Sequence, residues 1–218
     1  MQRFLILVVA FFTGLAGQAV ACRMALVLAI DVSSSIDIGE YKFQTRGLAD
    51  ALLDPEIAGV LVLHEVALSV VQWSGADEGD LSIPWRRMLS YREVRDFSVR
   101  VRNMPRKWEG SNTAVGDAIA FSAAQFGRVS DCERKVIDMS GDGSSNAGLN
   151  AAVERRKAEA AGIEINGIAI DIIGASITAF YSRFVITSDG FVVTSRGFSD
   201  YPRSIREKLL RELIKLGS

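Results

Sequence analysis

The chain has 218 residues, of which 49% are hydrophobic and 23% are charged, and its formal net charge is −1. This length and hydrophobic content suit one α/β domain with a full core. Because a nearly neutral chain lacks the basic excess that nucleic-acid binding requires, we expect no nucleic-acid partner.

The first 21 residues have the layout of a secretory signal. A positive start at Arg3 precedes the apolar stretch Phe4–Phe12, and Ala19-Val20-Ala21 is a small-residue cleavage site. The apolar stretch is short for a bilayer span, which argues against an uncleaved membrane anchor. We therefore predict a signal peptide over residues 1–21, and one domain over residues 22–218 that is periplasmic or secreted and has no membrane span after cleavage.

Cleavage at this site makes Cys22 the first residue of the mature chain, which raises the alternative of a lipoprotein. Lipidated cysteines usually follow a bulky aliphatic residue three positions earlier, but Ala19 stands there. We therefore favour a released protein over a lipid-anchored one.

Residues 24–31 form an apolar run that ends on an aspartate, and serines follow at alternate positions. Such a run predicts a strand buried on both faces, as in the middle of a parallel sheet, and ligands bind beyond the carboxyl ends of such strands. Asp31, Ser33 and Ser35 offer only oxygen ligands, which suit a hard cation such as Mg²⁺. The alternative is that they cap the next helix, because Asp and Ser are preferred caps.

A helix and a hairpin should follow. Asp37 and Glu40 have capping-box spacing and predict a helix that ends near residue 54, with an apolar face formed by Ile38, Tyr41, Leu48 and Leu52. Strands are predicted over residues 66–73 and 81–85. Their seven-residue joint is too short for a crossover helix, so these strands should be antiparallel, and Pro84 places the second one at an edge.

Apolar periodicity and capping residues predict the remaining elements. Residues 56–63 fit either a short helix or a loop. Helices are expected over residues 92–104, 114–126, 150–162, 175–184 and from 200 onward, and strands over 136–140, 163–170 and 191–194. Alternating strands and helices predict a doubly wound, mostly parallel six-stranded α/β sheet with one antiparallel edge strand and helices on both faces.

Two cysteines in an exported chain predict one disulfide. Cys22 lies nine residues before Asp31, and Cys132 lies ten residues before Asp142, which also follows an apolar run. If the strands that lead to these aspartates are parallel neighbours, both cysteines lie at the opposite edge of the sheet, within bridging range. Two buried thiols are the alternative.

Three segments with oxygen ligands now stand at strand ends or helix starts: Asp31-x-Ser33-x-Ser35, Thr113 and Asp142-Gly143. In this order they are similar to the metal-ion-dependent adhesion site (MIDAS) of the von Willebrand factor type A domain. The resemblance extends over essentially the whole mature chain. It implies the doubly wound fold that the periodicity predicts.

More narrowly, the chain resembles an exported bacterial family of type A proteins of unassigned function. The similar segments are Val71-Gln-Trp73, Ile83-Pro-Trp85, residues 136–143 and the ending 206–212. One departure is Ser111-Asn112, which stands where the family commonly has two glycines. Asn tolerates left-handed backbone angles better than most residues, so the turn before Thr113 can survive.

The resemblance implies a role for each motif residue. Ser33, Ser35 and Thr113 would bind Mg²⁺ or Mn²⁺ through hydroxyl oxygens, and Asp31 and Asp142 would bind directly or through water. Two carboxylates neutralise a divalent ion without over-neutralising it, so an open coordination position attracts an incoming carboxylate. The implied function is non-enzymatic binding of an Asp or Glu of a protein partner.

Other interpretations are weaker. A metal-dependent hydrolase could use the same site, but the single histidine, His64, precedes the second strand and should lie at the opposite edge. A type A fold that no longer binds metal is a third interpretation. Dinucleotide binding is disfavoured because no G-x-G-x-x-G follows the first strand. We give Asp171 no role and expect Asp117 to act as a cap or to face solvent.

Overall fold

A computed structural model describes residues 22–172 and 174–216. The predicted signal peptide over residues 1–21 lies outside these residues. Within the described part, no helix has the length and apolar character that a membrane crossing requires.

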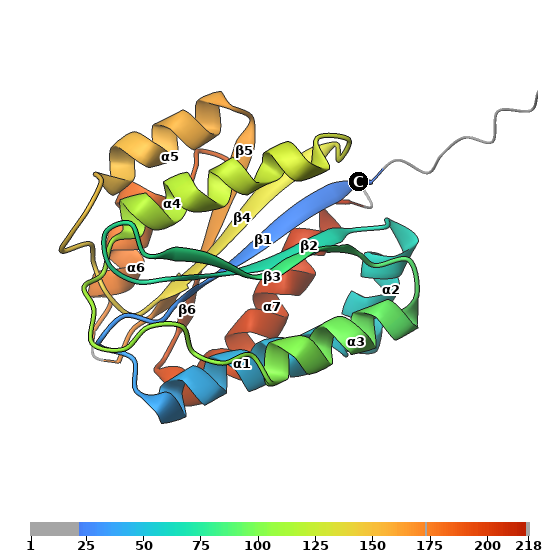
Figure 1. The fold of residues 1–218 in the computed structure, drawn as a ribbon, viewed down its shortest axis with the longest axis horizontal. Helices are drawn as coiled ribbons and strands as arrows, with labels where there is room; N and C mark the ends of the chain where they lie inside the picture. Colours follow the sequence, from blue (N-terminus) through green and yellow to red (C-terminus); the bar gives the residue numbers. More distant parts are fainter. Residues whose placement is uncertain (1–21, 173, 217–218) are drawn as a thin grey trace, which may run out of the picture.

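A six-stranded sheet forms the centre of the molecule, in the order β3-β2-β1-β4-β5-β6 (Figure 1). The strands are β1 (Met24–Asp31), β2 (Ala67–Trp73), β3 (Gly79–Arg87), β4 (Arg134–Gly141), β5 (Ile163–Ile170) and β6 (Val192–Ser195). All neighbours are parallel except β2 and β3, which are antiparallel. This confirms the predicted sheet, with Pro84 on the edge strand β3.

Helices cover both faces of the sheet. They are α1 (Ile38–Leu52), α2 (Pro55–Leu63), α3 (Tyr91–Arg102), α4 (Val115–Ala124), α5 (Ala151–Ala160), α6 (Ser176–Phe180) and α7 (Tyr201–Ile214). Figure 1 shows α1, α2, α3 and α7 on one face and α4, α5 and α6 on the other. Short turns η1 (Gln125–Val129), η2 (Tyr181–Val185) and η3 (Phe198–Asp200) complete the chain.

The two faces of β1 supply two separate cores. Leu26, Leu28 and Ile30 pack with the helices of the first face, whereas Val27 and Ala29 pack with those of the second. Every residue of β1 is buried for this reason, which explains its unbroken apolar run.

Local signals account for the first two helices. Asp37 and Glu40 form the predicted capping box at α1, but Ile38 is 55% exposed and does not join the core. Residues 56–63, which the sequence left open between helix and loop, are helical. Asp54 caps α2 by accepting from the amides of Glu56 and Ile57.

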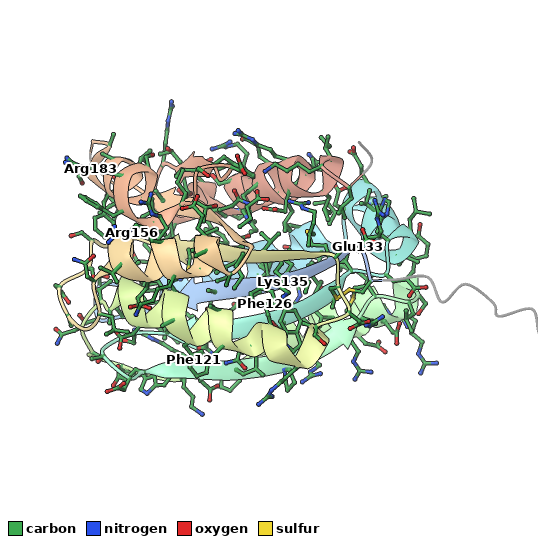
Figure 2. The ribbon with its side chains drawn as sticks, turned by 90° about the horizontal axis from the view of Figure 1, so that it is seen from above. Phe121, Phe126, Glu133, Lys135, Arg156 and Arg183 are labelled. Carbon is green, nitrogen blue, oxygen red and sulfur yellow. A yellow bond between two sulfur atoms is a disulfide. The ribbon has the colours of Figure 1, made fainter. Side chains whose placement is uncertain are left out.

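A disulfide closes the edge of the sheet where the parallel strands begin. Met24 on β1 pairs with Arg134 on β4, so Cys22 and Cys132, each two residues earlier, lie level. Their Cα atoms are 4.4 Å apart and their sulfurs are bonded, as the spacing predicts (Figure 2). The carbonyl of His64 accepts a hydrogen bond from Arg23 N at 3.2 Å, so the single histidine also lies at this edge.

Candidate metal centre

The carboxyl ends of β1 and β4 bring two of the three motifs together. Ile30 pairs with Ser140, so the residues that follow them leave the sheet side by side. Ser35 Oγ donates a hydrogen bond to Asp142 Oδ1 at 2.6 Å, although 107 positions separate these residues in the chain. Ser33 Oγ lies 3.3 Å from Ser35 Oγ. The first and third motifs therefore form one cluster.

The loop before α4 brings Thr113 to this cluster. Thr113 N donates to Asn146 Oδ1 and Asn146 N donates to Thr113 O, both at 2.9 Å. A Cβ atom placed on Gly143 would lie 3.5 Å from Thr113 Oγ1, so the threonine hydroxyl lies against the Asp142-Gly143 segment. The structure thus brings the five predicted ligand residues together at the carboxyl edge of the sheet.

The departure at Ser111-Asn112 does not disturb this loop. Among the described residues, the only non-glycine positions with positive φ are Glu65 and Asp77, so both Ser111 and Asn112 have ordinary backbone angles. Ser34 N donates to Ser111 O at 2.9 Å, which joins the loop to the β1–α1 loop. No glycine is needed at these two positions to place Thr113.

Asp31 is fully buried, and half of its carboxylate is unsatisfied. Oδ1 accepts a hydrogen bond from Ser33 N at 2.8 Å, whereas Oδ2 has no hydrogen-bond partner. Burial raises the pKa of Asp31 to about 7, against the hydrogen bonds from Ser33. An ionised carboxylate in this position needs a compensating charge, which a divalent cation between the motifs would supply.

Asp142 differs because it is partly exposed and hydrogen-bonded. Burial raises the pKa of Asp142 above its ordinary value, and the hydrogen bond from Ser35 limits the rise. No group of three or more His, Cys, Asp or Glu side chains among the described residues could hold a metal ion. A cation at this centre would therefore depend on hydroxyl oxygens, a donor set that fits Mg²⁺ better than a metal that prefers nitrogen or sulfur.

Tyr181 is the neighbour of the centre that the sequence does not reveal. Its side chain is fully buried and its hydroxyl has no hydrogen-bond partner. A Cβ atom on Gly141 would lie 2.6 Å from the Tyr181 hydroxyl and 2.8 Å from Asp31 Oδ2. Both oxygens therefore approach the same Cα atom, and only glycine fits there. Tyr181 comes from the π turn η2, where the periodicity predicts a continuous helix.

Two polar residues outside the three motifs bind the backbone of the segment that carries Asp31 and Ser33. Gln44 on α1 donates from Nε2 to Asp31 O at 3.1 Å. Arg106 donates from Nη2 to Val32 O and to Ser33 O, both at 3.0 Å. These contacts fix the backbone that presents the serines. Neither residue carries a motif, so the sequence offers no signal for them.

The two remaining acidic residues near this edge have structural partners. Asp117 accepts from Asp77 N at 3.1 Å and from Leu149 N at 2.6 Å, and so ties two loops to α4. Asp171 accepts from the amides of Ile177 and Thr178 at the start of α6. Asp117 therefore joins loops, where the sequence predicted a cap or a solvent-exposed side chain, and Asp171 holds the start of α6.

Comparison with protein families gives one match over nearly the whole chain. A family described as "Protein of unknown function (DUF1194)" matches residues 21–217. No curated protein matches the chain. The family match supports the narrower resemblance that the sequence indicates.

Solved structures share the fold at low sequence identity. Proximal thread matrix protein 1 from the mussel byssus, solved with its MIDAS motif occupied by zinc, is 20% identical, with a TM-score of 0.62 and coverage of 90% of this chain and 48% of that one. A von Willebrand factor type A protein from Catenulispora acidiphila is 15% identical (TM-score 0.64; 88% and 43% covered). The vWF domain of the type V pili tip protein Mfa5 from Porphyromonas gingivalis is 10% identical (TM-score 0.65; 91% and 97% covered).

These likenesses show that the chain has the von Willebrand factor type A fold, as its motifs indicate. It spans less than half the length of the mussel and Catenulispora chains and nearly all of the Porphyromonas domain.

Proposed function

Because the chain belongs to the DUF1194 family of proteins of unknown function, and has a type A fold, we propose that it is an exported binding protein with a MIDAS. It would hold Mg²⁺ or Mn²⁺ through Asp31, Ser33, Ser35, Thr113 and Asp142. The metal's open position would accept an Asp or Glu side chain of a protein partner. The function is binding, not catalysis.

The convergence of five oxygen-bearing side chains from three loops carries this proposal. The 2.6 Å hydrogen bond between Ser35 and Asp142 joins two of these loops directly. Asp31 Oδ2 is buried without a partner and lies close to Gly141, the residue before Asp142. A cation would relieve this unsatisfied oxygen while leaving the exposed side of the cluster open to a ligand.

The roles of the chain's own residues follow from their contacts. Arg106 and Gln44 hold the backbone of the first motif, and Asn146 holds that of Thr113. The hydroxyls and carboxylates therefore stand in place before a ligand arrives, which lowers the ordering cost of binding. When bound, the metal supplies a positive charge that attracts a carboxylate.

The comparisons support a divalent cation at this place without deciding which one. The MIDAS motif of the mussel protein holds zinc in its structure. In this chain the donors are oxygen atoms only, and the two carboxylates favour a hard cation. We therefore propose Mg²⁺ or Mn²⁺.

Export is the second part of the proposal. Residues 1–21 would be removed as a signal peptide, leaving residues 22–218 as a single domain in the periplasm or outside the cell. The disulfide between Cys22 and Cys132 fits an oxidising compartment. A Cys22 sulfur in a disulfide cannot also carry a lipid thioether, which argues against a lipoprotein.

A hydrolase using the same centre is less well supported. Water activation by a metal usually works together with a general base. The single histidine lies at the disulfide edge of the sheet. A hydrolase would show Mg²⁺-dependent turnover of phosphoester or peptide substrates that disappears in Asp142→Asn.

Thermal unfolding of the exported protein with Mg²⁺ and with chelator tests the metal proposal. A ligand at 100 times its dissociation constant adds about 2.7 kcal/mol to stability, so Mg²⁺ should raise the melting temperature by several degrees. Asp142→Asn should abolish this shift. Asp117→Asn is the matched control, because it lowers stability through the loops and leaves the Mg²⁺ shift unchanged. If neither Mg²⁺ nor Mn²⁺ raises the melting temperature of the wild type, the proposal is wrong.

A further inference from the structure

A groove lies beside the candidate metal centre, between the β4–α5 loop and the segment that joins α6 to η2. It has a volume of about 490 Å³, within the range of ligand-binding pockets. Leu149, Phe180 and Phe184 provide its large apolar side chains. We call it the β4–α5 groove.

The groove suits an uncharged side chain. Its ten lining residues include no Asp, Glu, Lys, Arg or His. Phe180 and Phe184 pack against each other with ring centroids 5.5 Å apart and are both partly exposed. Leu149 is 46% exposed. An aliphatic or aromatic side chain would bury apolar surface here without leaving a buried charge unpaired.

Two segments connect the groove to the metal centre. Asn146 lines the groove and exchanges hydrogen bonds with Thr113. Phe180 lines the groove, and the next residue, Tyr181, reaches the Cα of Gly141 beside Asp31. The groove and the predicted ligands are therefore neighbours at the carboxyl edge of the sheet.

The wall of the groove is held in place without a ligand. Asp117 accepts a hydrogen bond from Leu149 N at 2.6 Å, and Asn150 caps α5 by accepting from Val153 N. Gly148 has a φ of +69°, and a Cβ atom there would lie 2.0 Å from Asp117 Oδ2. The β4–α5 loop therefore packs closely against Asp117.

A positively charged side chain lies beside the aromatic wall of the groove. The guanidinium of Arg183 lies over the Phe184 ring, 5.1 Å from its centroid. Figure 2 shows Arg183 and Arg156 toward the end of the molecule away from the disulfide. A segment that carries a carboxylate would meet positive charge beside this apolar wall.

We propose that the β4–α5 groove binds an aliphatic or aromatic side chain of the same protein segment whose Asp or Glu occupies the metal. This inference rests on the proposed function and adds a second requirement to it. The partner would be an acidic segment with an apolar residue at a fixed distance from the acidic one. The metal alone would then give weak binding, and the groove would select the partner.

Synthetic peptides test this directly. Each Gly-Ser peptide carries one central Asp and one Phe, and the Phe is moved through every flanking position. NMR titration of the exported protein in Mg²⁺ gives the dissociation constants. We expect one Phe position to bind on the order of tenfold more tightly than the Phe-free peptide, as burial of one ring predicts.

Two substitutions test whether the gain in affinity from Phe arises in the β4–α5 groove. Leu149→Ser should remove most of the gain from Phe and leave the Mg²⁺-dependent binding of the Phe-free peptide unchanged. Leu63→Ser is the matched control, because Leu63 is 72% exposed on α2 and away from the groove. Leu63→Ser should change neither the gain in affinity from Phe nor the Mg²⁺-dependent binding of the Phe-free peptide.

The possible outcomes separate this inference from the proposed function. If Asp peptides bind in Mg²⁺ but no Phe position matters, the groove inference is wrong and the metal proposal stands. If Phe peptides bind equally well with Asn in place of Asp, the groove takes apolar ligands independently of the metal and the inference is overturned. If no peptide binds, the inference also fails, while the Mg²⁺ melting shift tests the metal site on its own.

Discussion

Two buried aspartates on neighbouring strands have opposite surroundings. Asp138 on β4 lies 2.5 Å from Lys208 Nζ, and the same ammonium lies 3.1 Å from Glu212. Asp31 on β1 is equally buried, yet no cationic side chain among the described residues forms an ion pair with it. Within the described residues, a lysine provides the positive charge for Asp138, whereas Asp31 has no such partner. Because a buried carboxylate needs compensation when it is ionised, this difference supports the proposed cation beside Asp31.

The ion pairs of Lys208 are formed by groups of the protein itself. Burial opposes the charge of Lys208, but the carboxylates of Asp138 and Glu212 raise its pKa above the ordinary value. Asn166 donates from Nδ2 to both Glu212 oxygens, at 3.0 and 2.8 Å. The stability that Lys208 gains from its partners is present below the ordinary pKa of lysine and is lost only at more alkaline pH. This network therefore serves as an internal reference for the metal centre.

Removing the internal cation should give the largest effect. Lys208→Met leaves Asp138 without its cationic partner and leaves Glu212 with only Arg134, at 3.8 Å, which should cost about 3 to 5 kcal/mol in the free energy of unfolding by urea. Arg206→Met is the control, because Arg206 forms a half-exposed ion pair with Asp54 whose loss should cost about 0 to 1 kcal/mol. Equal losses in the two variants would mean that burial does not distinguish these ion pairs.

The pH dependence of the metal-free protein should reveal Asp31. The folded pKa of about 7 lies above the unfolded value of 3.8, so the unfolded state loses its proton first. This group therefore lowers stability as pH rises from about 4 to 7, by up to roughly 4 kcal/mol.

Urea unfolding in chelator across this pH window measures the effect. Asp31→Asn should flatten the profile, because no charge then develops in the buried site. With Mg²⁺ present, the stabilisation by the metal should grow as pH rises, since the metal requires the ionised carboxylate. If wild type and Asp31→Asn give the same profile, ionisation of Asp31 does not lower the stability of the folded protein as predicted.

Much of the fold follows from local signals, and so does the location of the candidate centre. The β1 run ends at Asp31 because both faces of that strand are buried up to the point where the sheet opens to ligands. Asp37 with Glu40, Asn150 and Pro84 each act within a few residues, so their effects are visible in sequence. The position of Cys132 also follows from strand register, once β1 and β4 are neighbours.

Non-local contacts account for what sequence reasoning missed. Tyr181 meets Gly141 across 40 residues, and no periodic pattern encodes that approach. Lys208 and Glu212 lie on a helix rich in charged residues, where charged side chains are normally solvated, yet both are fully buried. Ile38 shows the opposite error, because an apolar residue in the first turn of α1 faces solvent.

Close packing at Gly141 should produce an intermediate effect. Gly141→Ala forces a Cβ atom against the Tyr181 hydroxyl and Asp31 Oδ2, which should cost about 1 to 3 kcal/mol and weaken the Mg²⁺ shift. Gly127→Ala is the matched control, since a Cβ atom there meets no atom within 4 Å, and it should be neutral or stabilising. If both variants unfold at the same urea concentration as the wild type, the crowding at Gly141 is unimportant.

Removing the Tyr181 hydroxyl should have the smallest effect. Tyr181→Phe deletes a buried hydroxyl that has no hydrogen-bond partner, so the metal-free protein should change by less than about 1 kcal/mol or become slightly more stable. Urea unfolding in chelator measures this change. A loss above about 2 kcal/mol would reveal a hydrogen bond that the metal-free centre depends on.

A crystal structure of the protein grown with Mn²⁺, with the ion located by its anomalous signal, is the decisive experiment for the metal centre. We expect one ion bound among the side-chain oxygens of Ser33, Ser35 and Thr113, with Asp31 and Asp142 coordinating it directly or through water. A Mn²⁺ ion bound elsewhere, or none at this point at a concentration that saturates the protein, would contradict it.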